Sequence, residues 1–166
     1  MKKKNRIYSD DFGVNLNRAL RFLSFRPRSE KEIRDYLSKK KVSELVVQKI
    51  ISKLKENKFL NDMEFARWWI EQRTLIKPRA WRVIKIELKQ KGISKETIEE
   101  LEQNTEFKLQ NDLEMAIKLA QNRLPRYKNL PKEEIYQKMG RFLVSKGFDW
   151  ETIKISIDEV FSKEYN

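Results

Sequence analysis

The chain has 166 residues, of which 39% are hydrophobic and 37% charged, and its formal net charge is +12. This composition is unfavourable for a single deep core and favours small helical units with thin cores. Cysteine and histidine are absent, which excludes disulfides, thiolate metal sites and the commonest general bases. No apolar run approaches the roughly 20 residues that cross a bilayer, so we expect a cytoplasmic protein without a membrane segment.

Residues 1–14 are predicted to form a basic, flexible N-terminal arm. Beyond them, apolar residues recur at spacings of three and four, which is typical of helices. Four polar residues are placed to cap helix starts: Ser29, Asn61, Ser94 and Asp149. Glu32 follows Ser29 at the spacing of a capping box. Gly92 and Gly147 each follow a lysine, and we expect them to end helices in the left-handed conformation.

Three segments of the chain share one pattern. The sequence "LKQKGISKETIEEL" (88–101) aligns with "LVSKGFDWETIKIS" (143–156), and "LSKKKVSELVVQKI" (37–50) fits the same frame with Lys41 in place of glycine. We therefore predict an all-α fold of three tandem three-helix repeats: repeat 1 (15–60), repeat 2 (61–104) and repeat 3 (105–166). A unit of about 50 residues buries little surface alone, so neighbouring repeats should stack into an elongated, curved array.

The basic residues are concentrated in two places. Residues 1–60 hold 17 Lys and Arg against 7 Asp and Glu, and residues 73–95 hold 8 against one. The first loop of each repeat ("SFRPRSE", "QRTLIKPRA" and "NRLPRYKNLPKE") combines proline with arginine or lysine, which predicts a basic rim along the array. Such patches attract nucleic acid or acidic protein surfaces, although a solvated face is the alternative interpretation.

The segment 77–93 carries the clearest binding signal. On a helix, Trp81, Ile84 and Leu88 would form a buried stripe opposite a basic stripe that only one nearby acid interrupts. A solvated helix usually interleaves acids with its bases, so this stripe favours binding. The candidate binding residues are Arg26, Arg28, Arg73, Lys77, Arg79, Arg82, Lys85 and Lys89.

Two other motifs admit a chemical interpretation. Asp62 and Glu64 could suggest a metal-dependent nuclease, but both lie in a first helical turn, where acids suit the helix dipole. We therefore interpret them as part of a helix start. Trp68 and Trp69 could stack on single-stranded bases, but we favour packing. We expect no enzymatic activity, no metal and no cofactor.

Four stretches together resemble the RecX family, regulatory proteins of RecA. They are "ALRFLSFRPRSEKEIRDYL", "VVQKIISKLKENKFLNDMEFARWWIEQR", "KPRAWRVIKIELKQKGI" and "FLVSKGFDWETIK". The resemblance runs from about Leu16 to Val160. Ala80 stands where the family usually has glycine, and Lys41 stands where glycine often ends the second helix.

The resemblance implies a protein that lies in the helical groove of RecA–DNA filaments. Members of the family suppress strand exchange, ATP hydrolysis and coprotease activity by RecA, and in some bacteria they tune RecA in other ways. This implies a role in homologous recombination, DNA repair and the SOS response, with the RecA filament and its single- or double-stranded DNA as partners. We expect a monomer. The alternative is a stand-alone, helix-turn-helix-like nucleic-acid-binding protein that acts without RecA.

Overall fold

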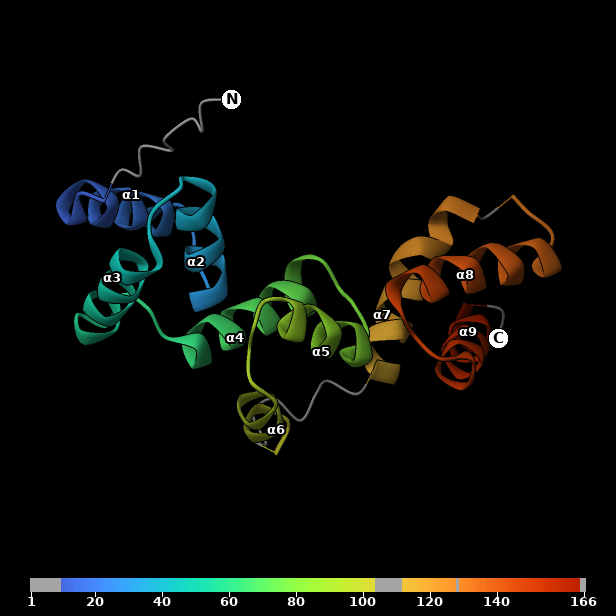
Figure 1. The fold of residues 1–166 in the computed structure, drawn as a ribbon. Helices are drawn as coiled ribbons and strands as arrows, with labels where there is room; N and C mark the ends of the chain where they lie inside the picture. The colour runs from blue at the N-terminus through green and yellow to red at the C-terminus, as the bar shows by residue number, and fades with distance from the viewer. Residues whose placement is uncertain (1–9, 104–111, 128, 165–166) are drawn as a thin grey trace, which may run out of the picture. The chain divides into compact units, whose positions relative to one another are not determined.

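The computed structural model describes residues 10–103, 112–127 and 129–164 (Figure 1). These residues form nine α-helices and no strand, so the predicted all-α class is confirmed for them. The helices are α1 (Phe12–Ser24), α2 (Glu30–Lys39), α3 (Glu44–Glu56), α4 (Asp62–Glu71), α5 (Trp81–Gln90), α6 (Lys95–Gln103), α7 (Asp112–Arg123), α8 (Lys132–Lys146) and α9 (Trp150–Glu164). A π-helical turn, η1 (Gln72–Ile76), follows α4, and a 3₁₀ turn, η2 (Leu124–Tyr127), follows α7.

The described chain divides into two compact units. One holds the residues up to Trp68 together with Gln90–Ser94, and the other holds Trp69–Lys89 and the residues from Lys95 on. Helices α2 and α3 lie within the predicted repeat 1, which α1 enters from Phe12, three residues before the predicted start; α4–α6 lie within repeat 2 and α7–α9 within repeat 3. Repeat 2 is therefore shared between the two units, and the boundaries between repeats stay a prediction.

In the first unit, α1, α2 and α3 pack on one another around a small apolar core. Ala19 of α1 has no exposed surface, so the two other helices can approach α1 closely at that point. The remaining core residues are Ile33, Leu37, Val42, Val47, Ile50, Ile51, Leu54 and Leu60. They recur at the spacings expected of amphipathic helices.

In the second unit, α7, α8 and α9 pack around a second core. Small side chains again permit close helix packing, since Ala116 and Ala120 of α7 are fully buried. The other helices supply larger apolar groups, including Ile135, Leu143 and Ile153. The predicted stripe of α5 is buried as well: Trp81 is 7% exposed, and Ile84 and Leu88 are 0% exposed.

Most predicted helix boundaries are confirmed. Ser29 and Glu32 form a reciprocal capping box at the start of α2. The side chain of Asn61 accepts hydrogen bonds from the backbone N–H groups of Met63 and Glu64. The Asp149 carboxylate accepts one from the N–H of Thr152.

The predicted left-handed positions are also confirmed, since φ is +83° at Gly92 and +95° at Gly147. Lys41, at the equivalent position of repeat 1, adopts the same conformation, with a φ of +59°.

One local prediction needs correction, and one local feature was not predicted. The flexible arm was predicted to reach residue 14, but α1 begins at Phe12, because the Asp11 carboxylate caps it by accepting the Val14 N–H at 2.7 Å. Residues 1–9 lie outside the described residues. The π-helical turn after α4 was not predicted, because its i→i+5 hydrogen bonding leaves no simple periodic signal in the sequence.

Candidate functional site

The first turn of α2 makes several contacts with repeat 2. The Ser29 hydroxyl donates a hydrogen bond to the Lys91 carbonyl at 2.7 Å. The Glu30 N–H donates to the Asp62 carboxylate at 2.7 Å. The Glu32 carboxylate binds the Lys91 ammonium at 2.6 Å. The start of the second helix in repeat 1 therefore meets both the first residue of α4 and the end of α5.

The first turn of α5 makes the same kind of contacts with repeat 3. The Ala80 N–H donates to the Lys146 carbonyl at 3.0 Å. The Trp81 N–H lies 3.1 and 3.3 Å from the two Asp112 carboxylate oxygens. Since Asp112 begins α7 as Asp62 begins α4, the two sets of contacts are copies of one repeat junction: junction 1–2 around α2 and junction 2–3 around α5.

At each junction, a glycine of one repeat packs closely against the second helix of the repeat before it. A Cβ atom added to Gly92 would lie 2.7 Å from Cβ of Lys31, and one added to Gly147 would lie 2.2 Å from Cγ2 of Val83. Glycine is therefore needed at these positions for its small size as well as for its positive φ.

Basic side chains cover the carbonyl groups at the helix end in each junction. The Lys31 ammonium donates to the Gln90 carbonyl at 2.8 Å. Arg82 donates through Nε to the Gly147 carbonyl and through Nη2 to the Phe148 carbonyl at 3.5 Å. Arg79 donates to the Ser145 carbonyl at 2.5 Å. Cations are favourable at the negative end of a helix dipole, so these three residues help to hold the repeats together.

The two capping aspartates lie in unusual electrostatic environments. Burial, together with the nearby Glu30 carboxylate, raises the pKa of Asp62. Burial and the Asp149 carboxylate raise the pKa of Asp112 in the same way. Asp62 was predicted to belong to the start of its own helix, and the structure adds that it caps α2 across the junction. Among the described residues, no group of three acidic side chains could hold a metal ion.

Glu32 links two basic side chains at junction 1–2. Its side chain is 14% exposed and binds Arg26 at 2.8 Å and Lys91 at 2.6 Å. Burial alone would raise the pKa of Glu32, but hydrogen bonds and charge from Arg26 and Lys91 outweigh this effect and hold the pKa below its ordinary value of 4.5.

We therefore expect Glu32→Gln to lower the free energy of unfolding by about 1–3 kcal/mol near neutral pH. Because the folded-state pKa of Glu32 is depressed, its stabilising contribution is present above pH 4.5 and is lost as the pH falls through the folded value. Urea unfolding from pH 7 to pH 3 should show the difference between wild type and variant shrinking below pH 4.5. Glu56→Gln is the control, since its ion pair with Lys53 is exposed. A difference that is constant with pH would contradict this account.

The predicted basic stripe of α5 is only partly available to a partner. Arg79 and Arg82 are engaged at junction 2–3, and Lys85 pairs with Glu102 at 2.9 Å. The stripe was expected to have Glu87 as its only nearby acid. This expectation was wrong, because a residue 17 positions away in α6 supplies a second carboxylate. Lys89 is exposed.

Of the other candidate residues, some contact side chains within the protein and others are exposed. Arg73 binds the Glu87 carboxylate at 2.6 Å and stacks on Trp69, 4.5 Å from the ring centroid. Arg28 stacks on Phe22 at 3.8 Å. Lys77, in contrast, is exposed.

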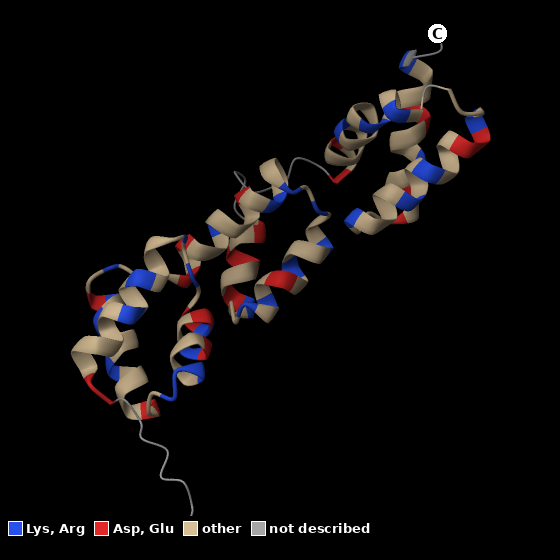
Figure 2. Cartoon of the chain, turned by 90° about the horizontal axis from the view of Figure 1, so that it is seen from above, with Lys and Arg blue, Asp and Glu red and all other residues tan. Residues whose placement is uncertain are grey.

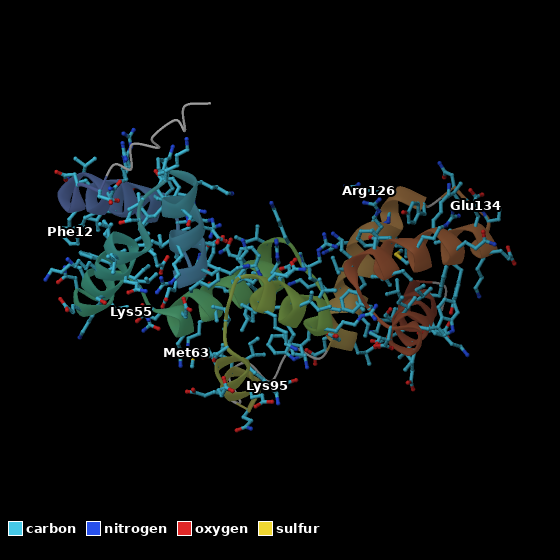
Figure 3. The ribbon with its side chains drawn as sticks, viewed as in Figure 1. Phe12, Lys55, Met63, Lys95, Arg126 and Glu134 are labelled. Carbon is cyan, nitrogen blue, oxygen red and sulfur yellow. The ribbon has the colours of Figure 1, made fainter. Side chains whose placement is uncertain are left out.

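The two tryptophans contribute to packing as predicted. Arg26 lies 5.5 Å from the Trp68 ring, and Phe65 lies 5.9 Å from it between ring centroids. The indole N–H of Trp69 donates to Glu87. Neither ring is fully exposed. Figure 2 shows that basic and acidic segments alternate within each unit, and Figure 3 shows long polar side chains covering the outer faces of the helices.

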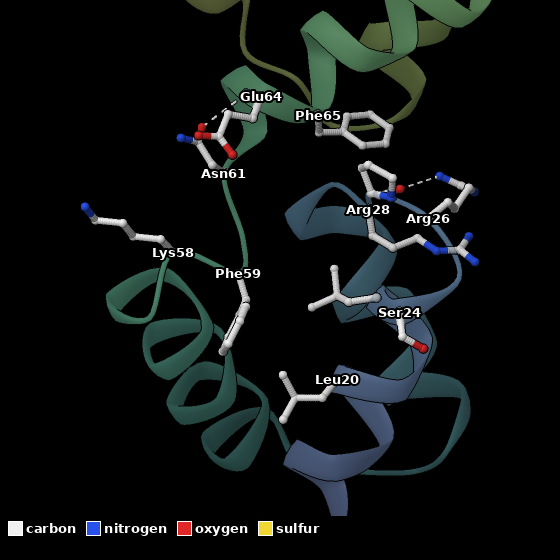
Figure 4. A pocket seen from close by; sticks show the side chains of 11 residues that line it. Leu20, Ser24, Arg26, Arg28, Lys58, Phe59, Asn61, Glu64 and Phe65 are labelled. Carbon is white, nitrogen blue, oxygen red and sulfur yellow. Dashed lines mark hydrogen bonds between the residues drawn. The ribbon is translucent and has the colours of Figure 1, made fainter.

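A hollow of about 530 Å³ lies beside the first loop of repeat 1 (Figure 4). We call it hollow 1. The residues that line it are Leu20, Leu23, Ser24, Arg26, Pro27, Arg28, Lys58, Phe59, Asn61, Glu64 and Phe65. Phe59 faces Leu20 and Ser24 across it, and charged side chains of both signs line it as well. No sequence pattern predicted it, because its walls come from separate segments of the chain.

A second hollow, hollow 2, has a volume of about 210 Å³ and lies beside the first loop of repeat 2. It is lined by Thr74, Leu75, Pro78, Glu114, Met115, Lys118, Leu119 and Asn122. Both hollows have a proline from the first loop of one repeat. Both also have a glutamate followed by an apolar residue from the first helix of the next repeat: Glu64 and Phe65 in hollow 1, Glu114 and Met115 in hollow 2.

Comparison with protein-family models gives three matches along the chain. Residues 16–54 match "RecX, first three-helix domain", residues 61–101 match the second and residues 110–155 match the third. The predicted succession of three three-helix repeats is thereby confirmed. No described helix is long and apolar enough to span a membrane.

Proteins named "Regulatory protein RecX" are similar to most of the chain. The relative from Bacillus velezensis (strain DSM 23117 / BGSC 10A6 / LMG 26770 / FZB42) is 36% identical over 152 residues, and that from Bacillus subtilis (strain 168) is 34% identical over 153. Each alignment covers 92% of this chain but 57% of the relative, so the chain spans little more than half the length of these relatives.

Two crystal structures have the same fold. RecX from Lactobacillus salivarius has a TM-score of 0.69 and 27% identity, over 93% of this chain and 99% of that one. A second structure, described as regulatory protein RecX, has a TM-score of 0.69 and 28% identity, over 90% and 74%. With three domain matches in order and relatives of this similarity, the chain belongs to the RecX family.

Proposed function

We propose that this protein regulates RecA by binding RecA–DNA filaments in their helical groove, and that it mostly inhibits the recombinase, ATPase and coprotease activities of RecA. The observation that carries the proposal is the ordered match of all three RecX domains over residues 16–155. The protein would act in the cytoplasm as a non-enzymatic monomer, within recombinational DNA repair and the SOS response.

Charge supports a polyanionic partner. The net charge of +12 favours encounter with a filament that carries DNA phosphate. Of the eight candidate residues, Lys77 and Lys89 are exposed and lie outside the junction contacts described above. Arg79 and Arg82 make contacts at junction 2–3. Their contribution to binding is therefore indirect: they stabilise the packing of the repeats that carry the exposed lysines.

Cosedimentation tests the proposal directly. The protein is centrifuged with RecA filaments assembled on single-stranded DNA, with the same DNA alone and with RecA alone. We expect the protein in the pellet with the filaments and a matching loss of DNA-dependent ATP hydrolysis. Equal affinity for DNA with and without RecA would instead favour the stand-alone nucleic-acid-binding alternative. Protein that stays in the supernatant with the filaments would contradict the proposal.

The variant Lys77→Glu/Lys89→Glu should bind filaments more weakly and with a smaller salt dependence. If each lysine contacts one phosphate, the slope of log affinity against log salt should fall by about 2. Cosedimentation across a salt titration measures this slope. Lys49→Glu/Lys154→Glu is the matched control, because it alters exposed lysines elsewhere and lowers the net charge by the same amount. If both variants weaken binding equally, only net charge matters and these two lysines form no specific site.

A further inference from the structure

Three basic side chains gather at the C-terminal end of α8. The Arg123 guanidinium lies 4.6 Å from the centroid of the Phe142 ring, and the Lys146 ammonium lies 5.4 Å from the same ring. Arg79 donates a hydrogen bond to the carbonyl of Ser145, the residue before Lys146. The three bases come from the loop before α5, the end of α7 and the end of α8. We call Arg79, Arg123 and Lys146 the basic cluster.

The positive charge of the basic cluster is not neutralised by the protein that surrounds it. No carboxylate among the described residues forms an ion pair with any of its three members. Burial and the charges of Arg79 and Arg123 lower the pKa of Lys146. The face of the Phe142 ring attracts cations, but it has no net charge that could offset the repulsion between them. The cluster therefore concentrates like charges on half-buried side chains.

The residue of repeat 2 that is equivalent to Arg123 has an acidic partner. Arg73 and Arg123 each stand seven residues after a fully buried alanine of the first helix. Arg73 binds the Glu87 carboxylate at 2.6 Å. Repeat 3 has Phe142 in place of Glu87, since each of these residues precedes the leucine that begins the aligned segments. Arg123 thus lies against a ring where its equivalent binds a carboxylate.

The residue of repeat 2 that is equivalent to Lys146 has an acidic partner as well. Lys91 and Lys146 each precede the glycine that follows the second helix. Lys91 binds the Glu32 carboxylate at 2.6 Å. Glu32 is the third residue of α2, and Val83 is the third residue of α5. Both acidic partners therefore have apolar residues in their place in the later copy, whereas both bases are present in it.

The chemistry of the cluster suits phosphate groups. The Nε atom of Arg123 donates to the neutral Tyr127 hydroxyl at 3.1 Å, and an arginine has five N–H donors, so others stay available to a ligand. Guanidinium groups and phosphate form strong, charge-assisted hydrogen bonds. The ring between Arg123 and Lys146 is approached by both cations, so the contact that the cluster offers is ionic. Nucleic-acid backbones are bound largely through charge, whereas protein interfaces depend on an apolar centre.

We propose that the basic cluster binds phosphate groups of a nucleic-acid backbone. Arg123 and Lys146 contact the phosphate, and Arg79, which stays bound to Ser145, adds its positive charge. The inference rests on the proposed function, which brings DNA to the protein, and it adds to that function a place on repeat 3 where DNA phosphate is held.

The test compares Arg123→Gln/Lys146→Gln with wild type by fluorescence anisotropy of a labelled single-stranded poly(dT) oligonucleotide. The double change should weaken DNA binding about tenfold at low salt. Since two phosphate contacts are lost, the slope of log affinity against log salt should fall by about 1.4. The matched control is Arg141→Gln/Lys154→Gln, which removes the same two charges from exposed positions of α8 and α9. The control should bind within about twofold of wild type.

A second variant removes no base and keeps the inference testable if the double variant does not fold. Val83→Glu supplies the carboxylate that α2 has at this position, and it should weaken DNA binding about fivefold by neutralising Lys146. Ile86→Glu is its control, because it makes the same charge change at an exposed position of the same helix. Circular dichroism and thermal unfolding of each variant establish that it is folded before binding is compared.

Three results would overturn the inference. Wild type that binds no poly(dT) at low salt would do so. Equal losses in the cluster variants and their controls would mean that net charge alone matters. Lost affinity for poly-glutamate with unchanged affinity for poly(dT) would mean that the occupant is an acidic polypeptide.

Cosedimentation with RecA filaments separates this inference from the proposed function. Wild type that binds poly(dT) through the cluster but stays in the supernatant with filaments would contradict the proposed function and support the cluster. Wild type that sediments with filaments, while the cluster variants and their controls bind DNA equally, would overturn the cluster alone.

Discussion

Replacing Gly147 with alanine should lower the free energy of unfolding by about 2–5 kcal/mol. A β-carbon at a φ of +95° costs about 1–2 kcal/mol. The same carbon would lie 2.2 Å from Cγ2 of Val83, and relieving such overpacking typically costs a further 1–3 kcal/mol. Urea or thermal unfolding followed by circular dichroism measures the loss.

The matched control for this change is Gly140→Ala, inside the helix α8 that Gly147 follows. An added Cβ at Gly140 meets no atom within 4 Å, and alanine is favoured over glycine inside a helix by about 1 kcal/mol. Gly140→Ala should therefore leave stability unchanged or raise it. Adding Val83→Ala to Gly147→Ala should recover part of the loss, because it removes the clash but not the backbone strain. Equal stability of the Gly147 and Gly140 variants would show that junction 2–3 does not depend on close approach.

Leu88→Ala should destabilise the protein by about 2–5 kcal/mol. The Leu88 side chain is fully buried on the inner face of α5, so its truncation removes apolar contacts and leaves a cavity. Ile86→Ala is the control on the same helix, because Ile86 is 54% exposed and should lose little. Chemical denaturation of both variants measures the difference. A loss at Ile86 as large as that at Leu88 would mean that the buried and exposed faces of α5 have been assigned incorrectly.

Much of the local structure could be predicted because its determinants are close together in the sequence. Ser29 and Glu32 form the capping box that their spacing indicates, and Gly92 and Gly147 take the positive φ that their place after a helix indicates. The buried stripe of α5 follows from helical periodicity in the same way.

The junction contacts could not be predicted, because they join residues far apart in the chain. Arg82 and Gly147 are 65 residues apart, and Ser29 and Lys91 are 62 apart. Periodicity placed Arg82 correctly on the polar face of its helix, but it could not show that backbone carbonyls of repeat 3 would meet that face. Some residues chosen for their charge serve the contacts between repeats.

Lys41 has a consequence for how an array of this kind can gain units. The second helix of a repeat placed before repeat 1 would contact position 41, where the other two repeats have glycine. It would meet Lys41 there, which has a side chain and a φ of +59°. It would also find Asn15 at the position that Asp62 and Asp112 occupy in the later repeats, so a neutral amide would replace the capping carboxylate. Tandem duplication of repeat 2 would supply both the glycine and the aspartate, whereas duplication of repeat 1 would supply neither. Repeat 1 therefore lacks two of the features by which repeats 2 and 3 contact the repeat before them.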